Sequence, residues 1–278
     1  TTATPIAVDK EIAKRLPELT DVNFRGGILM WVPEIFKIEN PAAHMTWNSW
    51  HMSGIERKAI AQGFSFYAPI RYSELPRYYR ESATKPDVAV FQVAPMDEHG
   101  YFNFGPNASH MSACCETSKV VIVEVNENMP VCLGGFENGV HISNVDMIVE
   151  GSNPTIAEMG GGAAATDVDE AVAKLIVDEI PDGACLQLGI GSIPDAVLTF
   201  LGGKKDLGIH SEMVSDGVVD LYEKGIITCK AKNFHKDKMV ITFLMGTKKL
   251  YEFADDNPVI EMMPVDFVNN PMVIGQND

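Results

Sequence analysis

Short apolar runs alternate with amphipathic stretches along the first half of the chain. Runs rich in valine, isoleucine and phenylalanine predict strands over residues 26–32, 64–70, 87–95 and 119–126. They are nearly continuous in apolar residues, which is typical of strands that are covered on both faces of a parallel sheet. Residues 73–81 predict a short connecting helix.

The same alternation continues in the second half. The pattern predicts strands over 184–190, 206–210, 239–246 and 259–268, and helices over 167–180, 194–201, 217–225 and 248–256. Strands and helices that alternate in this way indicate an α/β fold with largely parallel sheets. In such sheets, functional sites form beyond the carboxyl ends of the strands.

The helix predicted over 167–180 has the clearest pattern. Asp167 and Glu170 resemble a capping box, and Pro181 is expected to follow the end of the helix. Its apolar side chains are expected to form one buried face. That face comprises Val168, Ala171, Val172, Leu175 and Ile176.

Residues 151–166 interrupt the alternation with a proline-containing segment followed by glycines and alanines. This composition predicts a linker between two domains. The alternative is that residues 159–163 cradle a phosphate, although no strand precedes them and the lysine and hydroxyl residue of a P-loop are missing.

Length, charge and cysteine content narrow the class of protein. The 278 residues suffice for one large or two ordinary domains, and the formal net charge is −16. So acidic a surface argues against a nucleic-acid partner, and an anionic ligand would have to be bound by local backbone N–H groups. Five cysteines without a CxxC motif favour a reduced, cytoplasmic protein without structural zinc. The pattern predicts neither a signal peptide nor a membrane span.

A glycine turn between a predicted strand and a predicted helix is the first candidate site. It comprises Gly189, Ile190, Gly191, Ser192 and Ile193. Glycines let a ligand approach the backbone, and the N-terminus of the following helix offers unpaired N–H groups to an anion. Ser192 and Asp195 fit the start signature of a helix. A plain strand–helix turn without a ligand remains the alternative.

The segment "GIHSEMVSDG", residues 208–217, is the second candidate. His210, Glu212 and Asp216 are a conceivable metal set, although the spacing is not specific. Ser211 lacks the G-x-S-x-G context of a hydrolase nucleophile. Two interpretations remain open on physical grounds. Glu212 is either a nucleophile or base at the end of a strand, or part of a solvated acidic loop. Gly208 to His210 are expected to end a strand, and Asp216 with Gly217 to lead into a helix.

Several segments closely resemble the acetyl-CoA hydrolase/transferase family. They include "DGACLQLGIGSIPDAVL", "KKDLGIHSEMVSDGVVDLYEKG", "TFLMGTKKLYEFADDNP", "PVDFVNNP" and "PDVAVFQVAPMDEHGYFNFG". The resemblance implies two open α/β domains with the active site between them. It assigns residues 1–160 to an N-terminal domain and 167–278 to the start of a C-terminal domain, with family segments expected beyond both ends.

The resemblance also implies roles for both candidates. Glu212 matches the family's catalytic nucleophile, and the Gly189–Ile193 turn matches a loop that contacts coenzyme A. The implied reaction moves CoA from butyryl-CoA or 4-hydroxybutyryl-CoA to acetate or another carboxylate through a glutamyl-CoA thioester. An acyl-CoA hydrolase and a non-catalytic piece that needs a partner chain are the alternatives.

Other expectations concern the surroundings of Glu212. Gln187, His210 and Ser211 are possible hydrogen-bond donors to it, although strand alternation favours turning Ser211 away, and Met213 is a further supporting residue. The CoA thioester is expected to be a substrate, with no metal and no permanently bound cofactor. The protein is expected to be a homo-oligomer, with a separate chain supplying the remaining C-terminal part as a further option.

Overall fold

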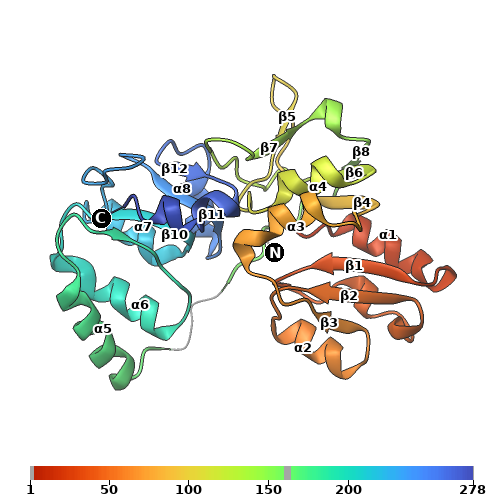
Figure 1. Cartoon of the computed structure of the whole chain (residues 1–278), viewed down its shortest axis with the longest axis horizontal. Helices are drawn as coiled ribbons and strands as arrows, with labels where there is room; N and C mark the ends of the chain where they lie inside the picture. Colours follow the sequence, from red (N-terminus) through yellow and green to blue (C-terminus); the bar gives the residue numbers. More distant parts are fainter. Residues whose placement is uncertain (1–2, 160–163, 278) are drawn as a thin grey trace. The chain divides into compact units, whose positions relative to one another are not determined.

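The computed structural model describes residues 3–159 and 164–277. They form two compact units, and the chain passes between them more than once (Figure 1). The first unit comprises Thr1–Phe102, Ala113–Met129 and Val140–Ala157. The second comprises Asn103–Ser112, Pro130–Gly139 and Glu158–Asp278. The predicted linker coincides with the last passage, but its residues 160–163 lie outside the described part of the chain.

The first unit contains two three-stranded sheets among its described residues, in the orders β1-β2-β3 and β4-β6-β8. Every pair in them is parallel. Trp47, Phe36 and Phe64 form the centre of one core, with ring centroids about 5 Å apart. The strands are β1 (Val22–Gly26), β2 (Met45–Ser49), β3 (Ser65–Tyr67), β4 (Val88–Val93), β6 (Val120–Val125) and β8 (Met147–Glu150). The helices are α1 (Ala7–Arg15), α2 (Gly54–Ala61) and α3 (Leu75–Glu81).

Three short elements lie where the chain passes between the units. They are β5 (Tyr101–Asn103), α4 (Met111–Thr117) and β7 (Gly139–His141).

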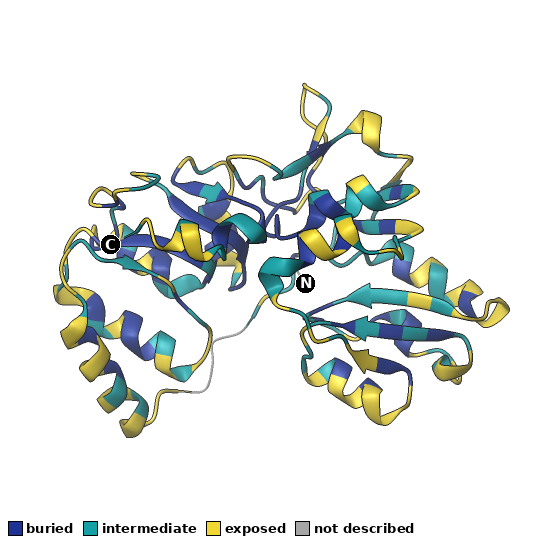
Figure 2. Ribbon diagram, viewed as in Figure 1, coloured by how far each residue is buried: buried dark blue, intermediate teal, exposed yellow. Residues whose placement is uncertain are grey.

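The second unit holds a parallel four-stranded sheet in the order β12-β11-β10-β9. Its central strands β10 and β11 are almost entirely buried, as the dark blue ribbon shows in Figure 2. The strands are β9 (Cys185–Leu186), β10 (Gly208–Val214), β11 (Met239–Leu244) and β12 (Ile260–Met262). The helices are α5 (Asp167–Glu179), α6 (Ser192–Phe200), α7 (Asp216–Glu223), α8 (Lys248–Ala254), α9 (Val265–Val268) and α10 (Pro271–Ile274).

The predicted fold class, α/β with largely parallel sheets, is therefore confirmed. The strand predicted over 26–32 is wrong, because β1 ends at Gly26 and the apolar residues that follow lie in a loop. The strand predicted over 259–268 is only partly right. It stops at Met262, and Pro264 then precedes the one-turn helix α9, since proline cannot donate to a sheet ladder.

Helix α5 forms where predicted, but it buries a different face. Ala173 and Val177 are buried, whereas Val168 and Leu175 of the predicted face are 71% and 70% exposed. The capping box is also one residue earlier than expected. Thr166 is the N-cap, and its side chain and that of Asp169 each accept a hydrogen bond from the other residue's backbone N–H. The helix ends at Glu179, before Pro181 as predicted.

Candidate functional site

Glu212 lies inside the central strand β10 rather than just beyond its end. The strand continues to Val214, four residues further than the sequence pattern indicates. Its parallel ladder with β11 pairs Ser211 with Ile241 and Met213 with Phe243. The sequence pattern does not predict this extension, because three consecutive polar residues, 210–212, are not typical of a buried strand. Their polar groups form hydrogen bonds within the protein.

The carboxylate of Glu212 is half-buried and accepts a short hydrogen bond. Nδ2 of Asn269 donates to Oε2 of Glu212 at 2.6 Å. Asn269 is the C-cap residue that directly follows α9, so the end of this helix places the Asn269 amide next to β10. One carboxylate oxygen is thereby oriented, while Oε1 has no hydrogen-bond partner in the part of the chain that the structure describes.

The donors expected for Glu212 make their hydrogen bonds elsewhere. Nε2 of His210 lies 2.9 Å from the carbonyl of Val268. The exposed Gln187 folds back, and its Nε2 donates to the carbonyl of Leu188 at 2.8 Å. The actual donor, Asn269, was missed, because a predicted strand over 259–268 does not bring the following residue onto β10.

Strand alternation turns Ser211 to the opposite face of the sheet from Glu212. The Ser211 hydroxyl accepts from the Leu188 N–H at 3.0 Å and donates to the Met213 carbonyl at 2.6 Å. Met213 shares that face and is 2% exposed, which is a packing position. The hydroxyl of Ser211 therefore joins β10 to the segment after β9.

Burial lowers the pKa of His210. The hydrogen bond to Val268 opposes this shift, and the Lys232 and His235 charges add to it. Since a carbonyl oxygen can only accept, the proton is assigned to Nε2. Nδ1 is buried and has no hydrogen-bond partner within the described part of the chain. The ladder places Thr242 beside Glu212, and its buried Oγ1 likewise has no partner among the described residues.

A buried lysine supports the same strand from the loop between α7 and β11. Lys232 is 2% exposed, and its Nζ donates to the carbonyls of Ile209 at 2.9 Å and Lys238 at 2.8 Å. Burial lowers the pKa of Lys232. A lone lysine in a polar loop carries no sequence signal of burial, so this residue could not have been singled out from the pattern.

The predicted coenzyme A loop forms the turn into α6. Gly191 is the N-cap with a φ of 129°, a conformation that favours glycine. Ile190 and Ile193 are 48% and 38% exposed. Within the described part of the chain, the backbone N–H groups of residues 189–193 have no hydrogen-bond acceptor. The expected Ser192–Asp195 cap is wrong, because Gly191 is the N-cap of α6 and the helix has no side-chain cap.

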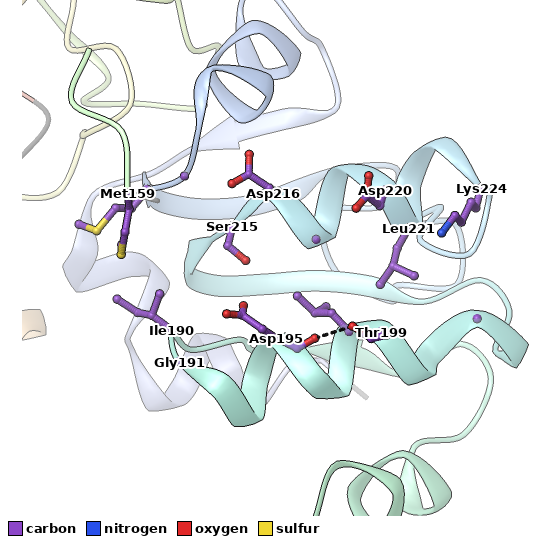
Figure 3. Close-up of a pocket in the computed structure, with 15 residues that line it drawn as sticks. Met159, Ile190, Gly191, Asp195, Thr199, Ser215, Asp216, Asp220, Leu221 and Lys224 are labelled. Carbon is purple, nitrogen blue, oxygen red and sulfur yellow. Dashed lines mark hydrogen bonds between the residues drawn. The ribbon is translucent and has the colours of Figure 1, made fainter. Parts of the chain in front are cut away.

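A cavity of about 590 Å³ lies between α6 and α7 (Figure 3). Ile190 and Gly191 of the loop line it, together with apolar side chains of both helices. Asp195, Asp216 and Asp220 also line it, and burial together with the Asp216 charge raises the pKa of Asp195. Glu212 is not among the lining residues. Lys224 lines the cavity beside the three aspartates, and its size alone does not make it the reaction site.

Among the residues that the structure describes, His210, Glu212 and Asp216 do not come together as a metal site. No group of three or more histidine, cysteine, aspartate or glutamate side chains there could hold a metal ion. Asp216, the third member of the conceivable metal set, begins α7 and binds the N–H and hydroxyl of Thr247. All five cysteines are free thiols.

Two family models match the chain. The acetyl-CoA hydrolase/transferase N-terminal domain matches residues 1–158, and the C-terminal domain of the same family matches residues 246–278. The chain belongs to the acetyl-CoA hydrolase/transferase family.

Members of this family are similar along nearly the whole chain. A butyryl-CoA:acetate CoA-transferase of Anaerostipes caccae is 62% identical over 269 residues, which are 96% of this chain and 60% of the relative. A 4-hydroxybutyrate coenzyme A transferase of Clostridium kluyveri is 45% identical over 240 residues, or 86% of this chain and 55% of the relative. The chain thus spans about 60% of the length of such relatives.

Solved structures agree with this family assignment. The crystal structure of RipA from Yersinia pestis has a TM-score of 0.91 at 32% identity, and covers 100% of this chain and 66% of that chain. The 4-hydroxybutyrate CoA-transferase of Porphyromonas gingivalis has a TM-score of 0.78 at 36% identity, and covers 97% of this chain and 70% of that chain.

Proposed function

We propose that the protein is an acyl-CoA:carboxylate CoA-transferase with Glu212 as its nucleophile. The substrates are a short-chain acyl-CoA, butyryl-CoA or 4-hydroxybutyryl-CoA, and acetate or another carboxylate. The observation that carries the proposal is the Glu212 carboxylate, half-buried on a central strand and oriented by Asn269 at 2.6 Å. The names of the family's similar members supply the substrate class.

The reaction is covalent catalysis in which a carboxylate serves as both attacking and leaving group. Oε1 of Glu212 attacks the thioester carbonyl, and CoA leaves as a thiolate to give an acyl-glutamyl anhydride. The thiolate then attacks the glutamyl carbonyl, which releases the first carboxylate and forms a glutamyl-CoA thioester. The acceptor carboxylate repeats both steps in reverse and departs as the new acyl-CoA, so Glu212 is regenerated.

The turn at Gly189–Ile193 is the proposed contact with the CoA thioester. Its N–H groups have no acceptor within the described residues, so they are available to carbonyl or anionic oxygens. A backbone donor aimed at a developing oxyanion is worth about 10²–10³ in rate. The thioester is written as a substrate, with no permanently bound cofactor in the proposal.

The wider setting is part of the same proposal. We assign residues 1–160 and 167–278 to the two family domains, and expect a homo-oligomer in the cytoplasm, with a separate C-terminal chain as an option. In the described residues, no helix is both long enough and apolar enough to cross a membrane.

The test is a kinetic assay of the protein as its gene encodes it, with butyryl-CoA as donor. Acetyl-CoA should form only when acetate is present, and double-reciprocal plots against acetate at several butyryl-CoA concentrations should be parallel. Glu212→Gln, which keeps the size and the hydrogen-bond acceptor, should abolish the reaction. Release of free CoA at a rate independent of acetate would instead identify a hydrolase, and full activity of Glu212→Gln would refute the assigned nucleophile.

A further inference from the structure

His210 is a buried titratable residue that the proposed reaction does not use. It is 5% exposed, and its Nε2 donates to the Val268 carbonyl at 2.9 Å. Its side chain lies on the same face of β10 as Glu212, because residues two apart on a strand share a face. Because its Nε2–H already donates to a backbone carbonyl, this N–H is not available to bind a substrate.

The acceptor of this hydrogen bond directly precedes the residue that holds Glu212. Val268 is the last residue of α9, and Asn269 follows it with its amide on Glu212. Strand β10 therefore forms hydrogen bonds with two consecutive residues at the end of α9. His210 binds the backbone of the first, and Glu212 binds the side chain of the second.

Helix α9 needs such an anchor because it is only four residues long. A single helical turn is unstable by itself, so its place depends on tertiary contacts. Val265 and Val268 are buried, and the Val265 N–H donates to the Ser109 carbonyl at 2.9 Å, which secures the start of the helix. At the end of the helix, just before Asn269, the buried Val268 accepts the hydrogen bond from His210.

The neutral state of His210 suits this role. Its Nε2–H meets an acceptor, whereas the buried Nδ1 has no partner among the described residues that could accept a second proton. A charged imidazole would therefore bury an unpaired donor. Burial lowers the pKa of His210, and this outweighs the hydrogen bond to Val268, which raises it.

We propose that His210 is a positioning residue for the nucleophile: it fixes the Val268 carbonyl and, through the chain, the Asn269 amide that orients Glu212. This inference rests on the proposed function, since it gives the orientation a catalytic purpose. An error of about 1 Å in the position of a reacting group can cost about 10² in rate. Loss of the anchor should therefore lower kcat without weakening substrate binding.

The test is a double-mutant cycle on the full protein. His210→Leu removes the donor, His210→Gln retains an N–H near the position of Nε2, and Asn269→Ala removes the amide. We expect His210→Leu to lower kcat roughly 10- to 100-fold with KM for the acyl-CoA within about twofold, and His210→Gln to recover most of the loss. In the Asn269→Ala background, His210→Leu should cost no further activity.

A second readout does not depend on catalysis. Amide hydrogen exchange over residues 265–270 should quicken in His210→Leu, and not in His210→Gln or in Ser211→Ala, a buried change on the other face of β10. Unchanged exchange, or full additivity of the His210 and Asn269 effects on kcat, would overturn the proposal. Should His210→Leu not fold, His210→Gln compared with His210→Asn, which has a shorter reach, tests the same anchor. A wild-type protein without transfer activity would refute the proposed function, whereas the exchange result would still decide whether the anchor exists.

Discussion

At the residue scale, the arrangement around Glu212 rests on one short contact. The 2.6 Å hydrogen bond from Asn269 fixes one carboxylate oxygen, and the other has no hydrogen-bond partner among the described residues, which is what an attacking carboxylate requires. The polar neighbours in sequence, His210 and Ser211, hold the backbone on either face of β10 instead. Their proximity to Glu212 along the chain is thus a poor guide to what their side chains contact.

Two substitutions of Asn269 test separately the orientation of the Glu212 carboxylate and the charge next to it. Asn269→Ala removes the donor and should lower kcat about 10-fold or more, as expected for one hydrogen bond to a charged group. Asn269→Asp places a second carboxylate next to Glu212 and should lower kcat further than Asn269→Ala does. Steady-state kinetics measure both effects. Asn270→Ala is the matched control, because Asn270 caps α10 through the Met272 N–H. Equal activity of Asn269→Asp and wild type would contradict the assigned contact.

At the element scale, the sequence predicts the continuous strands better than the segments around the site. Residues 87–95 and 239–246 read as buried strands because apolar residues fill both faces, and β4 and β11 form there. Strand β10 was cut short because its polar residues are satisfied by Leu188 and Val268, partners distant in sequence. Helix α5 has a wide apolar side that extends past the predicted face to Ala173 and Val177, so its pattern could not decide which part is buried. Tertiary contacts determine the length of β10 and the buried face of α5.

Ser211 tests the structural account of β10. Ser211→Ala leaves the buried Leu188 N–H without its acceptor, which should cost about 1–3 kcal/mol of unfolding free energy. Chemical denaturation measures this loss, and the rate of CoA transfer should remain close to that of the wild type. A large loss of activity in a folded Ser211→Ala protein would point to a hydroxyl in the chemistry, against the observed orientation.

At the scale of the whole molecule, the net charge of −16 leaves little long-range attraction for an anionic thioester. The fold class follows from the alternation, whereas the location of Glu212 inside a central strand does not, because the pattern ends that strand at His210. The donor to Glu212 does not follow either, because it depends on how a one-turn helix at 265–268 packs on a strand more than fifty residues earlier.

Acid stability of the whole molecule should depend on a second buried histidine. Burial lowers the pKa of His110 from 6.5 to about 4. The folded protein therefore keeps His110 neutral while the unfolded chain takes up a proton, so its stabilising contribution is present above pH 6.5 and is lost as the pH falls towards 4. The full loss is on the order of 3 kcal/mol.

Denaturation at pH 7 and pH 4.5 measures this contribution. His110→Gln should lose less stability between the two values than the wild type does, whereas His51→Gln, an exposed site, should behave as the wild type. An unaltered pH dependence in His110→Gln would show that His110 does not titrate in this way.

The central claim is that Glu212 carries CoA during turnover. The protein is incubated with butyryl-CoA without an acceptor, digested, and the peptide that contains Glu212 is analysed by mass spectrometry. The account predicts a CoA adduct on Glu212 that disappears within one turnover when acetate is added, with acetyl-CoA as the product. A competent, active protein whose Glu212 peptide stays unmodified, or an adduct on another residue, would contradict it.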